Sequence, residues 1–219
     1  MKHVILRFLL LIVVIGGGGA IVYFSLHYEP NLPIYNPSDI NPQLVDKTVR
    51  GEMRNHSVGD FKLTNQLNET ITPDNFKNKI YVACFIFTTC EGICPAMTGN
   101  LKSVYKEYLD DDEIMFLSHS VTPEKDSVSV LKAYADKFGV QNHQKWHFTT
   151  APRKHIYELA RMHYFAATDS GDGGPSDFVH TENLVLVDKE KRLRGFYDGT
   201  DYDELDRLKE DITKLKEEY

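Results

Sequence analysis

The chain has 219 residues, of which 42% are hydrophobic, and it carries a formal net charge of −7 at pH 7. This length suffices for one sizeable globular domain with appendages. The acidic balance, without a cluster of lysine and arginine beyond the extreme N-terminus, argues against a nucleic-acid partner. Only three cysteines are present, all between residues 84 and 94, which excludes a fold held together by several disulfides.

The first 27 residues are typical of a membrane anchor. Lys2 and Arg7 precede an uncharged run at residues 8–26, which is long enough as a helix to cross a bilayer. Positive charges ahead of the run predict a single-pass anchor that carries the domain on the extracytoplasmic, periplasmic side. A cleaved signal peptide is the alternative, with residues 8–15 as its apolar core and small residues at 18–20 as the cleavage site. No cysteine follows the run, so lipoprotein attachment has no support.

Residues 28–54 contain four prolines among polar residues, a composition that predicts an extended linker. A domain at residues 55–219 is expected to follow. Its expected strands cover residues 61–63, 80–87, 114–117, 146–148, 183–187 and 193–197, and the last two form a hairpin. Its expected helices begin near Pro95, span residues 127–138 and 153–162, and end the chain after a cap at Thr200. This order predicts an α/β fold, with a central sheet flanked by helices on both faces.

Two connecting segments are strongly polar. The acidic run at residues 110–113 is expected to be a solvated turn between a helix and the next strand. Residues 168–177 consist of turn-forming types throughout, which predicts an exposed loop. This loop leads directly to His180.

The most informative motif is Cys90-Glu-Gly-Ile-Cys94-Pro95, which stands where the apolar strand at 80–87 runs into a helix. Thiolates bind metals and attack disulfides, and a helix N-terminus stabilises the anion. The motif therefore predicts a chelating or redox dithiol in a thioredoxin-like strand–turn–helix unit. Cys-X-X-Cys is the usual redox spacing. The additional residue here increases the separation of the two sulfurs, which favours binding a metal between them. Cys84 lies within the strand and is expected to be buried rather than to bind a metal.

Three segments together resemble the Sco/SenC family. Residues 90–95 resemble its Cys-X-X-X-Cys-Pro signature, and residues 118–126 resemble its strand followed by an Asp-Pro-Glu-Arg-Asp-like segment. Residues 179–181, Val-His-Thr, occupy the place of its Asp-His-Thr. The resemblance extends from about residue 58 to the C-terminus, and the N-terminal anchor is also in character for this family.

The resemblance implies a thioredoxin-like fold and a copper site with Cys90, Cys94 and His180 as the metal ligands. Two positions depart from the family pattern, because Thr122 and Val179 stand where the family usually has aspartate. Neither position is a ligand. The missing carboxylate beside His180 is expected to affect how the imidazole is held or how a partner is recognised.

The implied ligand set suits copper in both oxidation states. Two soft thiolates favour Cu(I), and an imidazole also satisfies Cu(II). Zinc accepts the same residue types, but a three-ligand zinc site usually serves catalysis, and no catalytic base is evident nearby. No organic cofactor is expected. Without the resemblance, His180 would be one of nine histidines, and Met97, at helical spacing, is expected to fill the core rather than to bind copper.

Two functions of different classes follow. The resemblance implies a membrane-tethered copper-binding protein that delivers copper to, or prepares, the binuclear copper centre of cytochrome c oxidase. Its partners would be the copper-centre subunit of the oxidase and a copper donor protein or thiol reductant. The alternative is an extracytoplasmic thiol-disulfide oxidoreductase, with Cys90 and Cys94 as attacking and resolving thiols and no need for His180. A peroxidase is less favoured, because no arginine lies near Cys90 in the sequence, and a redox sensor stays open.

Overall fold

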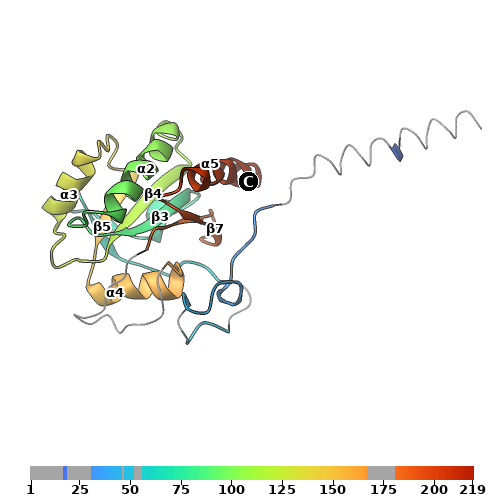
Figure 1. Ribbon diagram of the computed structural model, residues 1–219, viewed down its shortest axis with the longest axis horizontal. Coiled ribbons are helices and arrows are strands. Elements are labelled where there is room, and N and C mark those ends of the chain that lie inside the picture. Colours follow the sequence, from blue (N-terminus) through green and yellow to red (C-terminus); the bar gives the residue numbers. More distant parts are fainter. Residues whose placement is uncertain (1–16, 19–30, 46, 52–55, 167–180) are drawn as a thin grey trace, which may run out of the picture. The chain divides into compact units, whose positions relative to one another are not determined.

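The computed structural model describes residues 17–18, 31–45, 47–51, 56–166 and 181–219. Residues Leu32–Tyr219 form one compact unit (Figure 1). In the described ranges, no helix combines the length and apolar character that a bilayer span requires. Apart from residues 17 and 18, the predicted anchor lies outside the described residues, as do the predicted loop at 168–177 and His180.

A seven-stranded mixed sheet forms the centre of the unit, in the order β2-β1-β5-β4-β3-β6-β7. The parallel strands β3, β4 and β5 lie in the middle, and the remaining pairs are antiparallel. β3 is buried along its whole length, which explains why its sequence is a continuous apolar run rather than an alternating one. The strands are β1 (Leu63–Asn65), β2 (Thr70–Ile71), β3 (Ile80–Ile86), β4 (Ile114–Ser120), β5 (Trp146–Thr150), β6 (Asn183–Val187) and β7 (Leu193–Asp198).

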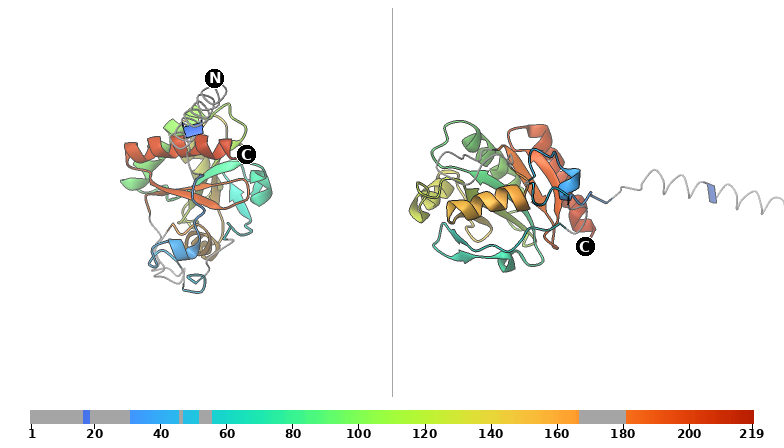
Figure 2. Two further views of the ribbon diagram at one scale, coloured as in Figure 1. Left: turned by 90° about the vertical axis from the view of Figure 1, so that its right-hand side faces the viewer. Right: turned by 90° about the horizontal axis from the view of Figure 1, so that it is seen from below.

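Helices cover both faces of the sheet, as the sequence predicted (Figures 1 and 2). One face packs against α2 (Ile93–Glu107), α3 (Val128–Lys137) and α5 (Tyr202–Glu217). The other face packs against α4 (Arg153–Glu158) and the π-helical turn η3 (Leu159–His163). Two short 3-10 helices complete the described elements, η1 (Pro37–Asp39) and η2 (Pro73–Phe76).

Most predicted elements are confirmed, with small shifts at their ends. The first strand begins at Leu63, and the last helix is capped by Asp201 rather than by Thr200. The Asp201 carboxylate accepts a hydrogen bond from the backbone N–H of Asp203, whereas the Thr200 hydroxyl donates to Asp198. Carboxylates cap helix N-termini well because they accept from unpaired N–H groups.

The compact unit begins at Leu32, well before the predicted domain boundary at residue 55. Tyr35 forms a β-bridge with Leu193, and Val45 is fully buried. The described residues of this proline-containing segment form only the short η1 helix and an isolated bridge as regular structure, but they still pack on the unit, because side chains elsewhere satisfy some of their backbone groups. The Arg194 guanidinium donates to the carbonyl oxygens of Leu32 and Pro33.

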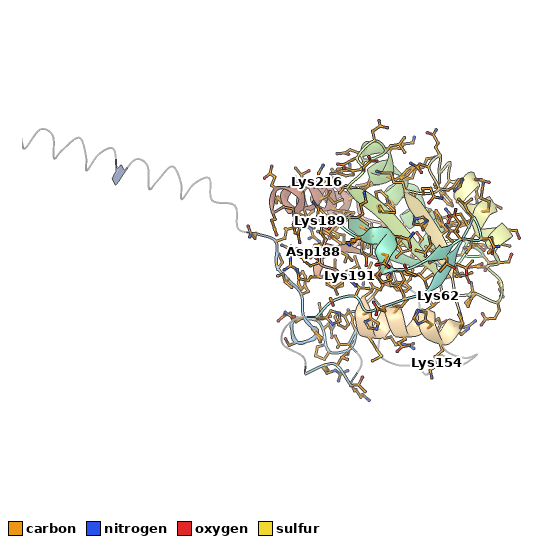
Figure 3. All side chains as sticks on the ribbon, turned by 180° about the vertical axis from the view of Figure 1, so that it is seen from behind. Lys62, Lys154, Asp188, Lys189, Lys191 and Lys216 are labelled. Carbon is orange, nitrogen blue, oxygen red and sulfur yellow. The ribbon has the colours of Figure 1, made fainter. Side chains whose placement is uncertain are left out.

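Arg194 is the centre of a buried ion cluster at the turn of the β6–β7 hairpin. Its side chain is 1% exposed and lies 3.1 Å from the fully buried carboxylate of Asp188. It also contacts the Glu218 carboxylate at 2.6 Å. Asp188 and its neighbour Lys189 lie on the same side of the molecule as Lys216, near the end of α5 (Figure 3). The Arg194 side chain therefore joins the N-terminal segment, the hairpin and the end of the last helix.

Replacing Arg194 with methionine should lower the free energy of unfolding by about 3 kcal/mol, because Glu218 loses its cation and the buried Asp188 carboxylate is left with Arg192 as its ion-pair partner. Denaturant unfolding of the full-length protein measures this. The control is Lys132→Ala, which removes an exposed i,i+4 pair with Asp136 and should have little effect. Equal stability of the two variants would contradict the central role of Arg194.

Candidate metal and redox site

The two predicted site cysteines lie where β3 passes into α2. Cys90 follows the strand and is partly exposed, whereas Cys94, the second residue of the helix, is buried. Both are free thiols. The backbone N–H of Cys94 donates to the Cys90 sulfur at 3.5 Å, so the helix N-terminus points directly at the first thiol.

The two thiols have opposite acid–base properties. Partial burial acts to raise the pKa of Cys90, but the N–H groups of Cys94, Gly92 and Ile93 outweigh it and lower the pKa below the ordinary thiol value. Burial raises the pKa of Cys94 to about 12. Cys90 is therefore the thiolate-forming, solvent-facing member of the pair, and Cys94 is a buried thiol beneath it.

The third cysteine is separate from this chemistry. Cys84 is 1% exposed within β3, and its sulfur lies 3.2 Å from the hydroxyl oxygen of Ser118. Burial raises its pKa to about 12, so the thiol stays protonated. The predicted burial of Cys84 is confirmed, and so is that of Met97, which is fully buried in the core.

His180, the predicted third ligand, lies outside the described residues, so its position relative to the thiols stays a prediction. Within the described part of the chain, no three or more histidine, cysteine, aspartate or glutamate side chains form a group that could hold a metal ion. Cys90 and Cys94 are thus the two predicted site residues that the structure brings together.

A buried carboxylate that sequence reasoning missed organises the turn before Cys90. Asp126 is fully buried, and its carboxylate accepts from the Thr88 hydroxyl at 2.6 Å and the Thr88 N–H at 3.3 Å. It also accepts from the hydroxyls of Ser120 at 2.6 Å and Thr122 at 3.0 Å. The carboxylate thereby joins the end of β4 to the turn that carries the dithiol.

Thr122 has a role here that its departure from the family pattern did not suggest. Its hydroxyl donates to Asp126, whereas an aspartate at this position would put a second carboxylate beside a buried one. The signal available in the sequence was Asp126 itself, the last residue of the segment that resembles the family. Its role depends on contacts with Thr88, 38 positions away, which no local pattern reveals.

Comparison with known proteins identifies the class. The dithiol at the junction of a central strand and a helix, on a mixed sheet covered on both faces, defines a thioredoxin-like fold. The family model described as SCO1/SenC matches residues 50–217. The chain therefore belongs to the SCO1/SenC family.

Individual relatives agree with this assignment. A SCO1 protein homolog of Bacillus subtilis (strain 168) is 28% identical over 155 residues, which cover 69% of this chain and 80% of the relative. The structure of BsSco, described as a member of the Sco family of cytochrome c oxidase assembly proteins with a disulfide switch, is 26% identical with a TM-score of 0.63, covering 74% of this chain and 94% of that one. Arabidopsis thaliana ScoI, solved with copper bound, shares the fold at 23% identity and a TM-score of 0.57, covering 74% and 98% of the two chains.

The difference in pKa between the two thiols predicts which one reacts first. In the reduced, metal-free protein, Cys90 should be alkylated by iodoacetamide faster than Cys94, with a rate that rises at a pH below that of an ordinary thiol. Mass spectrometry of partially labelled protein over a pH series measures both rates. Cys94→Ser serves as the control and should retain rapid labelling at Cys90. Faster labelling of Cys94 would refute this asymmetry.

Asp126→Asn should lower the free energy of unfolding by about 2–4 kcal/mol, because an amide nitrogen cannot accept the hydrogen bonds that a carboxylate oxygen accepts. We also expect a changed alkylation rate at Cys90, since the Thr88 turn loses its support. Asp136→Asn, on the exposed face of α3, is the matched control. If both variants match the parent in stability and in labelling rate, Asp126 does not position the turn.

Proposed function

We propose that this protein binds copper through Cys90, Cys94 and His180 and serves the assembly of the binuclear copper centre of cytochrome c oxidase. The observation that carries the proposal is the thiol pair itself, a solvent-facing thiol of lowered pKa above a buried one, in a member of the SCO1/SenC family. Two adjacent sulfur donors suit Cu(I), and an imidazole extends the site to Cu(II).

Copper is the cargo in this proposal. Cys90 is partly exposed, so a cysteine of a partner protein can approach a metal held there. Transfer by shared ligation then needs no release of free copper. The partners proposed are the copper-centre subunit of the oxidase as recipient and a copper donor protein or thiol reductant as supplier.

The membrane tether belongs to the same proposal, with residues 8–26 as a single-pass anchor and the domain on the extracytoplasmic side. The described chain after this segment packs on the compact unit from Leu32 onward.

The chain enters the compact unit at the end of the sheet opposite the dithiol. Leu32 contacts Arg194 and Glu218 beside the hairpin turn, and Val187, just before that turn, pairs with Tyr81 at the start of β3. Cys90 follows the other end of the same strand. Within the compact unit, the dithiol therefore lies at the end of the sheet opposite Leu32, and the partly exposed Cys90 is open to a partner there.

A second function, thiol-disulfide exchange on a partner's cysteines, is favoured by one specific observation. The pair combines a nucleophilic thiol with a buried thiol four residues further along the chain, which is the arrangement of an attacking and a resolving thiol. The two functions differ in their need for His180. Copper ligation requires the imidazole, whereas exchange does not.

Anaerobic competition of the reduced full-length protein, in detergent, against a coloured Cu(I) chelator tests the proposal. We expect one copper per chain and an affinity loss of more than about 100-fold in Cys90→Ser, Cys94→Ser and His180→Ala, since removing a ligand should cost more than removing its outer support. His143→Ala, which removes a partly buried imidazole 3.3 Å from the exposed Asp136 carboxylate, is the control.

Assembly of active oxidase in cells is the second readout for the same variants. Loss of assembly with His180→Ala, while thiol exchange in vitro survives, would support copper delivery over reduction. Copper binding that is indifferent to His180, with exchange activity dependent on both cysteines, would refute the three-ligand site and favour the oxidoreductase.

A further inference from the structure

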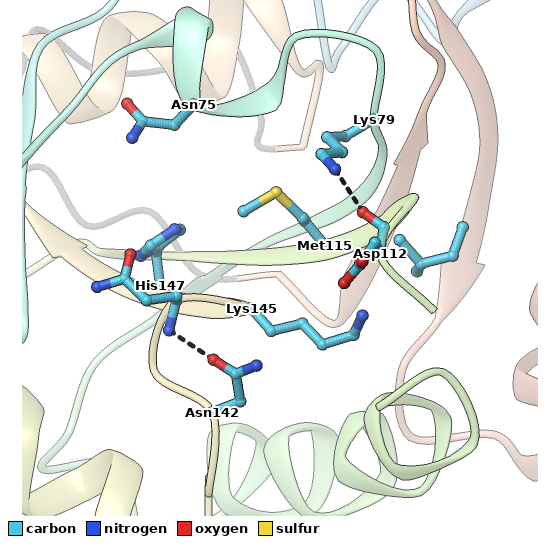
Figure 4. A pocket seen from close by; sticks show the side chains of 9 residues that line it. Asn75, Lys79, Asp112, Met115, Asn142, Lys145 and His147 are labelled. Carbon is cyan, nitrogen blue, oxygen red and sulfur yellow. Dashed lines mark hydrogen bonds between the residues drawn. The ribbon is translucent and has the colours of Figure 1, made fainter. Parts of the chain in front are cut away.

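A polar cavity of about 270 Å³ lies at the amino ends of the central parallel strands (Figure 4). Its walls include Lys79, just before β3, Ile114 and Met115 at the start of β4, and Lys145, just before β5. Cys90 follows the carboxyl end of β3. The cavity and the dithiol are therefore at opposite ends of the sheet and do not share residues.

Two asparagines in the cavity wall have their oxygens already engaged. Asn75 Oδ1 accepts from the backbone N–H of Thr72 at 2.8 Å, and Asn142 Oδ1 accepts from that of Gln144 at 3.1 Å. Among the described residues, neither amide nitrogen has a hydrogen-bond partner. Each asparagine therefore offers both amide donors to a ligand, while at least one lone pair of its oxygen is already used.

His147 is a third neutral donor. The hydrogen bond from Asn65 to its ring determines which ring nitrogen carries the proton. The amide nitrogen of Asn65 lies 3.3 Å from Nδ1, and its orientation is set because Asn65 Oδ1 accepts from the backbone N–H groups of Leu67 and Glu69. An amide nitrogen can only donate, so Nδ1 accepts and the ring proton is on Nε2. Burial lowers the pKa of His147 to about 4, which keeps the ring neutral at physiological pH.

Two lysines add positive charge to these donors. Lys145 is 6% exposed and donates to the backbone oxygen of Asp111, and Lys79 donates to that of Asp112 at 2.6 Å. Each ammonium group carries three donors, so one bond leaves capacity for a ligand. Burial lowers the pKa of Lys145, and the charge of Lys79 lowers it further while nearby aspartates oppose the shift. A bound anion would stabilise the charged form of Lys145 against both its burial and its repulsion by Lys79.

The acidic run at 110–113 does not cancel this charge as fully as its sequence suggests. The Asp111 carboxylate is paired with Lys216, and the Glu113 carboxylate is paired with Lys189 at 2.8 Å. The predicted turn is present, but lysines of α5 and of the hairpin neutralise it. Asp112, exposed at the rim, is the acidic residue that lines the cavity.

We propose that this cavity binds a small, multiply charged oxyanion, a phosphate or a polycarboxylate. Five lining side chains present donors. The acceptors are the Asp112 carboxylate and the amide oxygen of Gln144, whose nitrogen donates to Glu69, and this excess of donors favours an anion over a cation. The volume far exceeds that of a single water, about 30 Å³, and lies near the lower end of small-molecule sites, about 300 Å³. Ile114 and Met115 supply an apolar surface for the carbon skeleton of an organic anion. This binding is independent of the copper role.

Isothermal titration of the metal-free, full-length protein at low ionic strength, with inorganic phosphate and separately with citrate, tests the site. We expect one anion per chain, and the two arms distinguish a phosphate site from a carboxylate site. Lys79→Gln should weaken binding by roughly tenfold or more, the value of one charge-assisted hydrogen bond. Lys62 is an exposed lysine outside the cavity lining (Figure 3). Lys62→Gln removes the same charge and should leave binding unchanged.

Asn142→Asp is the second variant, because it keeps the oxygen that accepts from Gln144 and replaces the donor with a negative charge. It should abolish anion binding while Cu(I) affinity and unfolding stay as in the parent, which separates this inference from the proposed function. No binding of either anion by the parent protein would overturn the proposal. Equal weakening in Lys62→Gln and Lys79→Gln would overturn it too, since that result means a diffuse charge effect.

Discussion

The complete burial of β3 between two helical layers is the constraint on which the other features of this protein depend. The strand pairs with β4 on one side and β6 on the other, and its side chains alternate between the two core clusters. A strand held in this way has no freedom to shift by one residue, because every side chain would change faces. Its two ends are therefore rigid points, with the dithiol after one end and the polar cavity beside the other.

At the dithiol end, the fixed backbone sets the acid–base properties of the two thiols. The first turn of α2 directs N–H groups at Cys90 and lowers its pKa, while the same packing buries Cys94 and raises its pKa. The turn between strand and helix is in turn held by the buried carboxylate of Asp126 through Thr88. This carboxylate fixes the turn that leads to Cys90, an arrangement in which outer hydrogen bonds keep a reactive group oriented.

At the opposite end, charged groups stabilise chain connections. Arg194 ties the N-terminal segment to the hairpin and the last helix, and lysines from separate elements converge on the acidic turn before β4. Such clusters form inside a protein when each charge has a partner, because an unpaired buried charge is costly. The cavity is the place where this pairing is incomplete, and there donors outnumber acceptors.

Local patterns in the chain were enough to predict the alternating strands and helices, the buried Cys84 and the dithiol at the strand–helix junction. These features depend on apolar periodicity and on residues adjacent in the sequence, and burial follows directly from such patterns. The start of the compact unit at Leu32, the role of Asp126 and the donors of the cavity could not be predicted in this way. Each depends on side chains from distant segments that meet only when the sheet is assembled, because a buried polar group takes its partner from whatever the fold brings within hydrogen-bonding distance.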